Sequence, residues 1–151
     1  MQDPGFGRCL FFYAYHRVKK VGLFVTCLVD LMRPRIGFAA LELLQAAGCK
    51  VVVPEAQTCC GQPGYNSGNR ASAVALARKV AREFADCDYV VMPSGSCAGM
   101  MRTHYPDLLI DVLEAERAAL RALAERTYEF TDFLVNVAHY THQSINQSAN
   151  K

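Results

Sequence analysis

The chain has 151 residues, the length of one ordinary domain, and 52% of them are apolar, which is enough to build a hydrophobic core. Sixteen lysine and arginine residues against fourteen aspartate and glutamate residues leave a net charge of +2, which gives no reason to expect nucleic acid or a membrane surface as a partner. The apolar run at residues 9–15 is far shorter than the roughly 20 residues that cross a bilayer, and basic residues follow it rather than precede it, so we expect a cytoplasmic protein without a membrane span or signal peptide.

The first half of the chain predicts two strands separated by a helix. Residues 1–20 show no clean period and are expected to form an extension or arm. The apolar run 21–26 is rich in strand-forming residues and predicts the first strand. Pro34 suits the first turn of a helix, and Gly48 offers a left-handed stop for it. Residues 49–53 then predict the second strand.

The middle of the chain continues this alternation. A loop is expected at residues 55–69, and an amphipathic helix follows at 71–85. Residues 89–92 predict the third strand, and a loop at 94–99 leads into a short helix that ends near His104.

The last part of the chain predicts a long helix at residues 108–124 and a short fourth strand at 128–130. A final helix is expected at 132–137, capped by Thr131 or by its own first residue, Asp132. The polar tail that follows is expected to be flexible.

Strands that read as continuous apolar runs and alternate with helices are typical of a parallel sheet covered on both faces. We therefore predict an α/β fold, a small three-layer Rossmann-like parallel sheet of about four strands. The domain is expected to span residues 21–138, between the arm at 1–20 and the tail at 139–151.

Seven cysteines are many for a chain of this length, and their odd number excludes a complete set of intrachain disulfides. In the reducing cytoplasm such a pattern more often indicates metal or redox chemistry. Because cysteine also packs as a small hydrophobe, three of the seven are expected to be buried, inert thiols: Cys9, Cys49 and Cys87.

The other four cysteines follow the predicted strands. Cys27 follows the first strand, Cys59 and Cys60 lie in the loop after the second, and Cys97 lies in the loop after the third. Because the carboxyl ends of parallel strands share one edge of the sheet, where ligands bind, we expect the four thiols to meet there. Gly61 permits a backbone angle that other residues avoid and lets backbone N–H groups approach a bound cluster.

Three sequence blocks in this order resemble the cysteine-rich CCG domain of iron–sulfur proteins, over about residues 21–137. The blocks are LFVTCLVDLMRP (23–34), CCGQPGYNSGN (59–69) and PSGSCAGMMRTHYP (93–106). The family includes one of the subunits of heterodisulfide reductase and the iron–sulfur subunit of glycolate oxidase, and within it the blocks are most similar to the lactate utilization protein A group.

Two features depart from the usual pattern of the family. Its closing Cys-x-x-Cys is incomplete, because Met100 stands at the last position. The resemblance therefore implies an ordinary [4Fe–4S] cluster with four thiolates rather than the noncubane cluster of the reductase relatives. The family usually carries two such domains in tandem and this sequence shows one, so we expect a truncated chain, or a protomer that pairs with a second copy or a second CCG domain.

The resemblance implies that Cys27, Cys59, Cys60 and Cys97 hold this cluster, with Gly61 beside it, in an electron-transfer subunit of a system that oxidises L-lactate or a related 2-hydroxy acid. The expected partners are other subunits of a lactate-oxidising complex, and no catalytic residue is assigned. An exposed cluster is readily lost when a protein is prepared in air. The alternatives are a cluster-free module whose thiols sense oxidants or support a scaffold, and a zinc-binding domain, since four thiolates also suit zinc.

Overall fold

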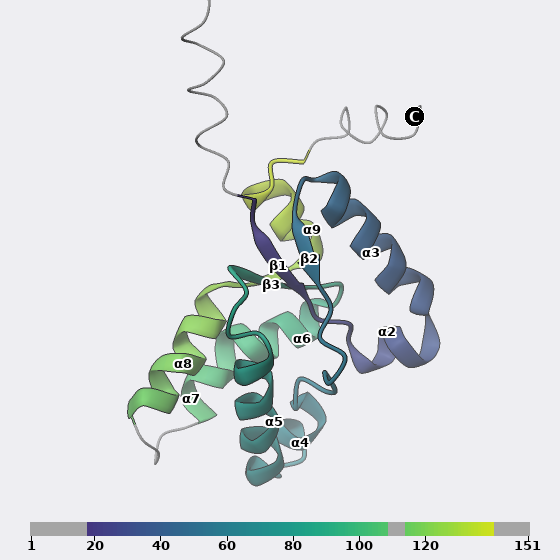
Figure 1. Ribbon diagram of the computed structural model, residues 1–151. Helices are drawn as coiled ribbons and strands as arrows, with labels where there is room; N and C mark the ends of the chain where they lie inside the picture. Colours follow the sequence, from purple (N-terminus) through teal and green to yellow (C-terminus); the bar gives the residue numbers. More distant parts are fainter. Residues whose placement is uncertain (1–17, 109–113, 141–151) are drawn as a thin grey trace, which may run out of the picture.

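A computed structural model describes residues 18–108 and 114–140 of the chain (Figure 1). Its centre is a sheet of four parallel strands in the order β2-β1-β3-β4. The strands are β1 (Lys20–Leu23), β2 (Lys50–Val52), β3 (Tyr89–Met92) and β4 (Thr127–Glu129). The predicted α/β fold with a small parallel sheet is therefore confirmed.

Helices and helical turns connect the strands and cover both faces of the sheet (Figure 1). In chain order they are α2 (Cys27–Met32), α3 (Pro34–Ala46), α4 (Gln62–Asn66), α5 (Arg70–Glu83), α6 (Gly95–Gly99), the π-helical η1 (Met100–His104), α7 (Tyr105–Leu108), α8 (Glu114–Glu125), α9 (Phe130–Asp132) and the π-helical η2 (Phe133–Val137). Among the described residues, none of these helices has the length and apolar character needed to cross a bilayer.

Alternate residues of the central strands point to opposite faces, so the sheet separates two hydrophobic cores. Val91 contributes to the core that α3 and η2 cover, together with Leu44 and Phe133. Its neighbour Val90 contributes to the larger core that α5, α6, η1, α7 and α8 cover. Gly22 lies in the middle of β1, where a Cβ atom would stand 2.4 Å from Cδ1 of Phe84, so the close packing of this ring requires glycine.

The order of the strands creates a crevice at one edge of the sheet. The chain leaves β1 through α3 to reach β2 on one side, and then passes through α5 to reach β3 on the other side of β1. The connections that leave β1 and β3 therefore diverge at the carboxyl-terminal edge, which is where ligands bind in open parallel sheets.

Two predicted loops contain helices. The predicted loop 55–69 contains α4, whose Pro63 lies in the first turn, where the missing N–H has little effect. The predicted loop 94–99 is mostly α6, so Cys97 lies in a helix and not in a loop. The reason is tertiary, because α6 continues through η1 into α7 and buries Ala98 and Met101 in the larger core.

Some predicted boundaries also differ from the structure. The first strand begins at Lys20 and ends at Leu23, because the N–H of Val25 bonds to the side chain of Gln57 instead of a neighbouring strand. A short helix, α2, begins directly at Cys27, where the sequence predicts none. The predicted helix 108–124 corresponds to α8 from residue 114 onward, and residues 109–113 lie outside the described part.

The last helical segment begins earlier than predicted. It starts at Phe130, and the cap is neither Thr131 nor Asp132. The carboxylate of Glu129 instead accepts hydrogen bonds from the N–H groups of Thr131 and Asp132, because β4 ends at this glutamate. Most of the predicted arm (1–17) and most of the predicted tail (141–151) lie outside the described residues.

Candidate metal centre

The four cysteines singled out from the sequence all lie at the carboxyl-terminal edge of the sheet. Cys27 is the first residue of α2, just after β1, and the buried hydroxyl of Thr26 caps this helix by accepting from the N–H of Val29. Cys59 and Cys60 lie between β2 and α4, and Cys97 lies in α6 after β3. Cys27 and Cys97 thus flank the crevice between the diverging connections.

The four thiols form two interacting pairs that also influence each other. The side chain of Cys27 interacts with that of Cys59, and the side chain of Cys60 interacts with that of Cys97. Electrostatic coupling between Cys59 and Cys60 and between Cys27 and Cys97 links the two pairs. Thiols from three separate connections therefore meet at one place, as the topology predicts, whereas their role as metal ligands stays a prediction.

The two pairs differ in exposure. Cys60 and Cys97 are buried, with exposed fractions of 2% and 8%. Cys27 and Cys59 are half-buried and line a groove of about 530 Å³ together with Asp30, Leu31, Val53, Gln57 and others. One pair is thus enclosed by the protein, and the other is accessible from solvent.

The hydrogen bond between Cys60 and Cys97 separates the pKa values of the two thiols. Donation from the Cys60 thiol, assisted by Ser94 and Ser96, lowers the pKa of Cys97 to about 6 in spite of its burial. The same hydrogen bond and burial raise the pKa of Cys60. Burial, followed by the proximity of Cys59, raises the pKa of Cys27. The lowered pKa favours the thiolate form of Cys97, and thiols lose their protons when they bind a metal.

Gly61 holds the turn of the vicinal cysteines, as the sequence predicts. Its φ angle is +85°, in the left-handed region that favours glycine. A Cβ atom here would also lie 3.4 Å from the Cα atom of Ala73 in α5. Its N–H approaches Sγ of Cys59 at 3.4 Å, so a backbone donor points at one of the four sulfurs of the candidate site.

Two residues that the sequence did not point to fix the cysteine-bearing segments. The hydroxyl of Tyr105 donates to the carbonyl oxygen of Cys60 at 2.8 Å, and both groups are buried. Burial raises the pKa of Tyr105, so this hydroxyl keeps its proton. The Oε1 atom of Gln57 accepts from the N–H of Val25 at 2.8 Å and ties the vicinal pair to the end of β1. The one feature of the sequence that could have indicated the Tyr105 contact is general: the hydroxyl of a buried tyrosine usually needs a hydrogen-bond partner.

The donor set fits an iron–sulfur cluster. Four thiols from three connections are the ligands that a [4Fe–4S] cluster requires. In the part of the chain that the structure describes, no three His, Cys, Asp or Glu side chains are close enough together to hold a single metal ion. In a [4Fe–4S] cluster each thiolate binds a different iron, whereas the four thiolates of a zinc site all lie about 2.3 Å from one ion.

The remaining cysteines do not join this site. Cys49 and Cys87 are buried just before β2 and β3, at the opposite edge of the sheet, and burial raises the pKa of each. The prediction that they are buried is confirmed, and Cys9 lies outside the described residues. Met100 is also buried in the larger core.

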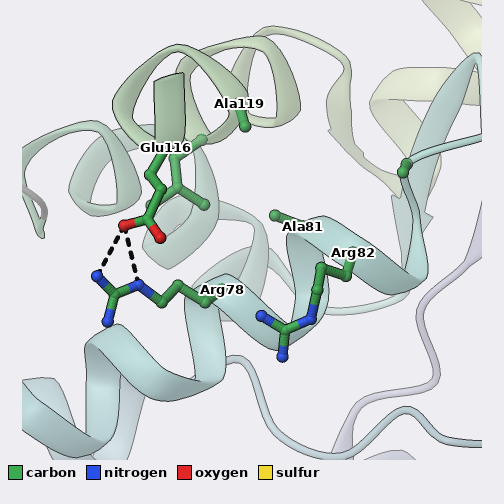
Figure 2. A pocket seen from close by; sticks show the side chains of 7 residues that line it. Arg78, Ala81, Arg82, Glu116 and Ala119 are labelled. Atoms are coloured by element: carbon green, nitrogen blue, oxygen red, sulfur yellow. Dashed lines mark hydrogen bonds and ion pairs between the residues drawn. The ribbon is translucent and has the colours of Figure 1, made fainter. Parts of the chain in front are cut away.

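A second groove lies between α5 and α8, away from the cysteines (Figure 2). It measures about 330 Å³. Arg78 and Glu116 form an ion pair of 2.7 Å across it, and Ala81 and Ala119 contribute small apolar side chains (Figure 2). Leu120 and Arg82 also line it, and Arg82 forms no ion pair with another described residue.

Comparison with known proteins places these features in context. The family model of the cysteine-rich domain CCG matches residues 21–102. The chain is 54% identical to Lactate utilization protein A of Geobacillus thermodenitrificans, over 78% of the chain and 48% of the relative. It is 50% identical to Lactate utilization protein A of Bacillus subtilis, over 78% of the chain and 49% of the relative. The chain thus spans about half the length of the curated relatives it matches, and no solved structure matches it.

Proposed function

Because the chain belongs to the family of cysteine-rich CCG domains, we propose that Cys27, Cys59, Cys60 and Cys97 hold a [4Fe–4S] cluster beside Gly61. We further propose that the chain is an iron–sulfur electron-transfer component of a system that oxidises L-lactate or a related 2-hydroxy acid. The convergence of four thiols from three connections carries the first proposal. The names of the relatives support the second.

The protein's own residues prepare the site for such a group. When bound, a [4Fe–4S] cluster supplies one-electron transfer. The lowered pKa of Cys97 favours its thiolate form, whereas Cys60 and Cys27, whose pKa values are raised, release protons on binding, so assembly of the site is favoured as pH rises. The N–H of Gly61 directed at Sγ of Cys59 stabilises negative charge on this sulfur, and hydrogen bonds of this kind tune the reduction potential.

The difference in exposure between the thiol pairs suggests a direction for electron exchange. Cys60 and Cys97 are enclosed, whereas Cys27 and Cys59 line an open groove. A protein partner that exchanges electrons with this site therefore approaches from the side of Cys27 and Cys59. The partners in this proposal are other subunits of a lactate-oxidising system.

Metal analysis after anaerobic reconstitution tests the cluster directly. We expect about four iron and four acid-labile sulfide per chain, a brown colour, and an EPR signal on reduction. Cys60→Ser is expected to lose iron with the fold retained. Cys87→Ala is the matched control, because Cys87 is an equally buried thiol at the opposite edge of the sheet, and it is expected to keep the full iron content.

Three results would contradict the proposal. Zinc in place of iron would indicate a zinc-binding domain, and a colourless chain without metal after reconstitution would indicate a cluster-free thiol module. Full iron content in the Cys60→Ser variant would show that the ligand assignment is wrong. The lactate proposal is tested separately, by the ability of the reconstituted chain to accept electrons from a lactate-oxidising extract and to lose this ability in Cys60→Ser.

A further inference from the structure

An apolar surface is exposed beside the candidate metal centre. It consists of five side chains from α2, α3 and the residue that follows β2, which we call the α2–α3 face: Leu28, Leu31, Met32, Phe38 and Val53. Leu31 is 78% exposed and Phe38 is 65% exposed. Soluble proteins rarely leave neighbouring large apolar side chains in water unless the surface contacts a partner.

The five side chains form one continuous surface. Leu28, Leu31 and Met32 share a side of α2, because residues three and four apart are neighbours on a helix. Phe38 and Val53 line a groove of about 220 Å³. Val53 also lines the groove beside Cys27, together with Leu31, so the two grooves join. In Figure 1, α2 and α3 follow one another along one side of the molecule.

This surface carries both acidic and basic side chains, so it can be complementary in charge to the same surface of a second copy. Asp30 lines both grooves, and Arg33 and Arg35 follow it at the junction of α2 and α3. All three are exposed, and none forms an ion pair with another residue in the described ranges. In a twofold symmetric contact, residue i meets residue j and residue j meets residue i. Asp30 of one copy can therefore pair with one of the two arginines of the other copy.

The size of the surface is sufficient for self-association. From their exposed fractions, the five apolar side chains present roughly 600 Å² per copy, and two copies would bury about 1,200 Å², the lower end of the range for specific interfaces. We infer that the α2–α3 face binds the same face of a second copy of this chain, with Asp30 of each copy opposite Arg33 or Arg35 of the other.

This dimer would affect the candidate metal centre without depending on it. Cys27 is the first residue of α2, and the groove that it lines with Cys59 includes Leu31 and Val53 of the α2–α3 face. A second copy bound here covers part of that groove, so it competes with any electron-transfer partner that approaches from the side of Cys27 and Cys59. The association itself rests on apolar area and charge, so it is expected whether or not a cluster is bound.

Sedimentation velocity on the full chain, kept reduced so that no intermolecular disulfide forms, tests this inference over a range of concentrations. The wild-type chain is expected to sediment as a dimer that dissociates on dilution. Leu31→Glu and Phe38→Glu are each expected to weaken the association by about tenfold or more, because apolar groups at the centre of an interface contribute most of its affinity. Glutamate is a good helix former, so both variants should keep their helical circular dichroism.

Val135→Glu is the matched control, because Val135 is 61% exposed on η2 and lines neither groove. It is expected to dimerise like the wild type. A wild-type chain that stays monomeric at all concentrations would overturn the inference and would indicate that the α2–α3 face binds a different protein. Dimers that survive both α2–α3 variants, or that Val135→Glu weakens equally, would also overturn it.

Discussion

The hydrogen bond from Tyr105 to the carbonyl oxygen of Cys60 offers a sharp test of how the vicinal cysteines are held. Replacing Tyr105 by phenylalanine removes a 2.8 Å hydrogen bond between two buried groups and leaves the ring in place. The Cys60 carbonyl then has no donor from this residue, and an orphaned buried polar group costs about 1–3 kcal/mol. For a chain of this length, each kcal/mol lowers Tm by about 2–4 °C.

Urea unfolding of the reduced, cluster-free chain measures this loss without interference from metal content. Tyr65→Phe is the matched control, because Tyr65 packs in the same region against His104 and its hydroxyl makes no hydrogen bond with the described residues. If the two variants unfold at the same urea concentration as the wild type, Tyr105 does not anchor Cys60. A second measurement, iron retention after reconstitution, is expected to fall in Tyr105→Phe and to stay unchanged in Tyr65→Phe.

Two further substitutions test the packing of β1 and its attachment to the cysteine segment. In urea titrations, Gly22→Ala is expected to destabilise the fold by about 1–3 kcal/mol, because the new Cβ atom would overlap the ring of Phe84. Gly95→Ala is the control, because a Cβ atom there meets no atom within 4 Å, and it is expected to have little effect. Gln57→Leu removes the acceptor of the Val25 N–H. The hydrogen-exchange protection of this amide is expected to fall by about tenfold, which corresponds to roughly 1.4 kcal/mol. Unchanged protection would show that the N–H finds another partner.

The positions of the strands could be predicted well from the sequence. Residues 89–92 are predicted as a strand and form β3, because strands buried on both faces read as uninterrupted apolar runs. The end of the helix before Gly48 can also be recognised from the local sequence, and the φ angle of +79° at Gly48 confirms the left-handed turn. The short helices are missed or misplaced, as at α6, because five residues are too few to show a helical period.

The candidate site could be predicted in part. Its cysteines are visible because each follows a strand, and strand ends of a parallel sheet share an edge. The pairing of Cys27 with Cys59 and of Cys60 with Cys97 could not be predicted, since it depends on how α2 and α6 are oriented against the intervening turn. The contact of Tyr105 with Cys60 joins residues 45 positions apart and leaves no trace in local periodicity.

By itself, the sequence determined the positions of the strands and of the longer helices, the turn glycines and the edge of the sheet where the thiols gather, because these follow from local apolar patterns and from the geometry common to parallel sheets. Only the tertiary structure decided that Cys60 and Cys97 are enclosed, that Cys27 and Cys59 line a groove, and that the α2–α3 face remains exposed. Burial and side-chain contact depend on which elements pack together in space, and neighbours in the sequence do not specify that packing.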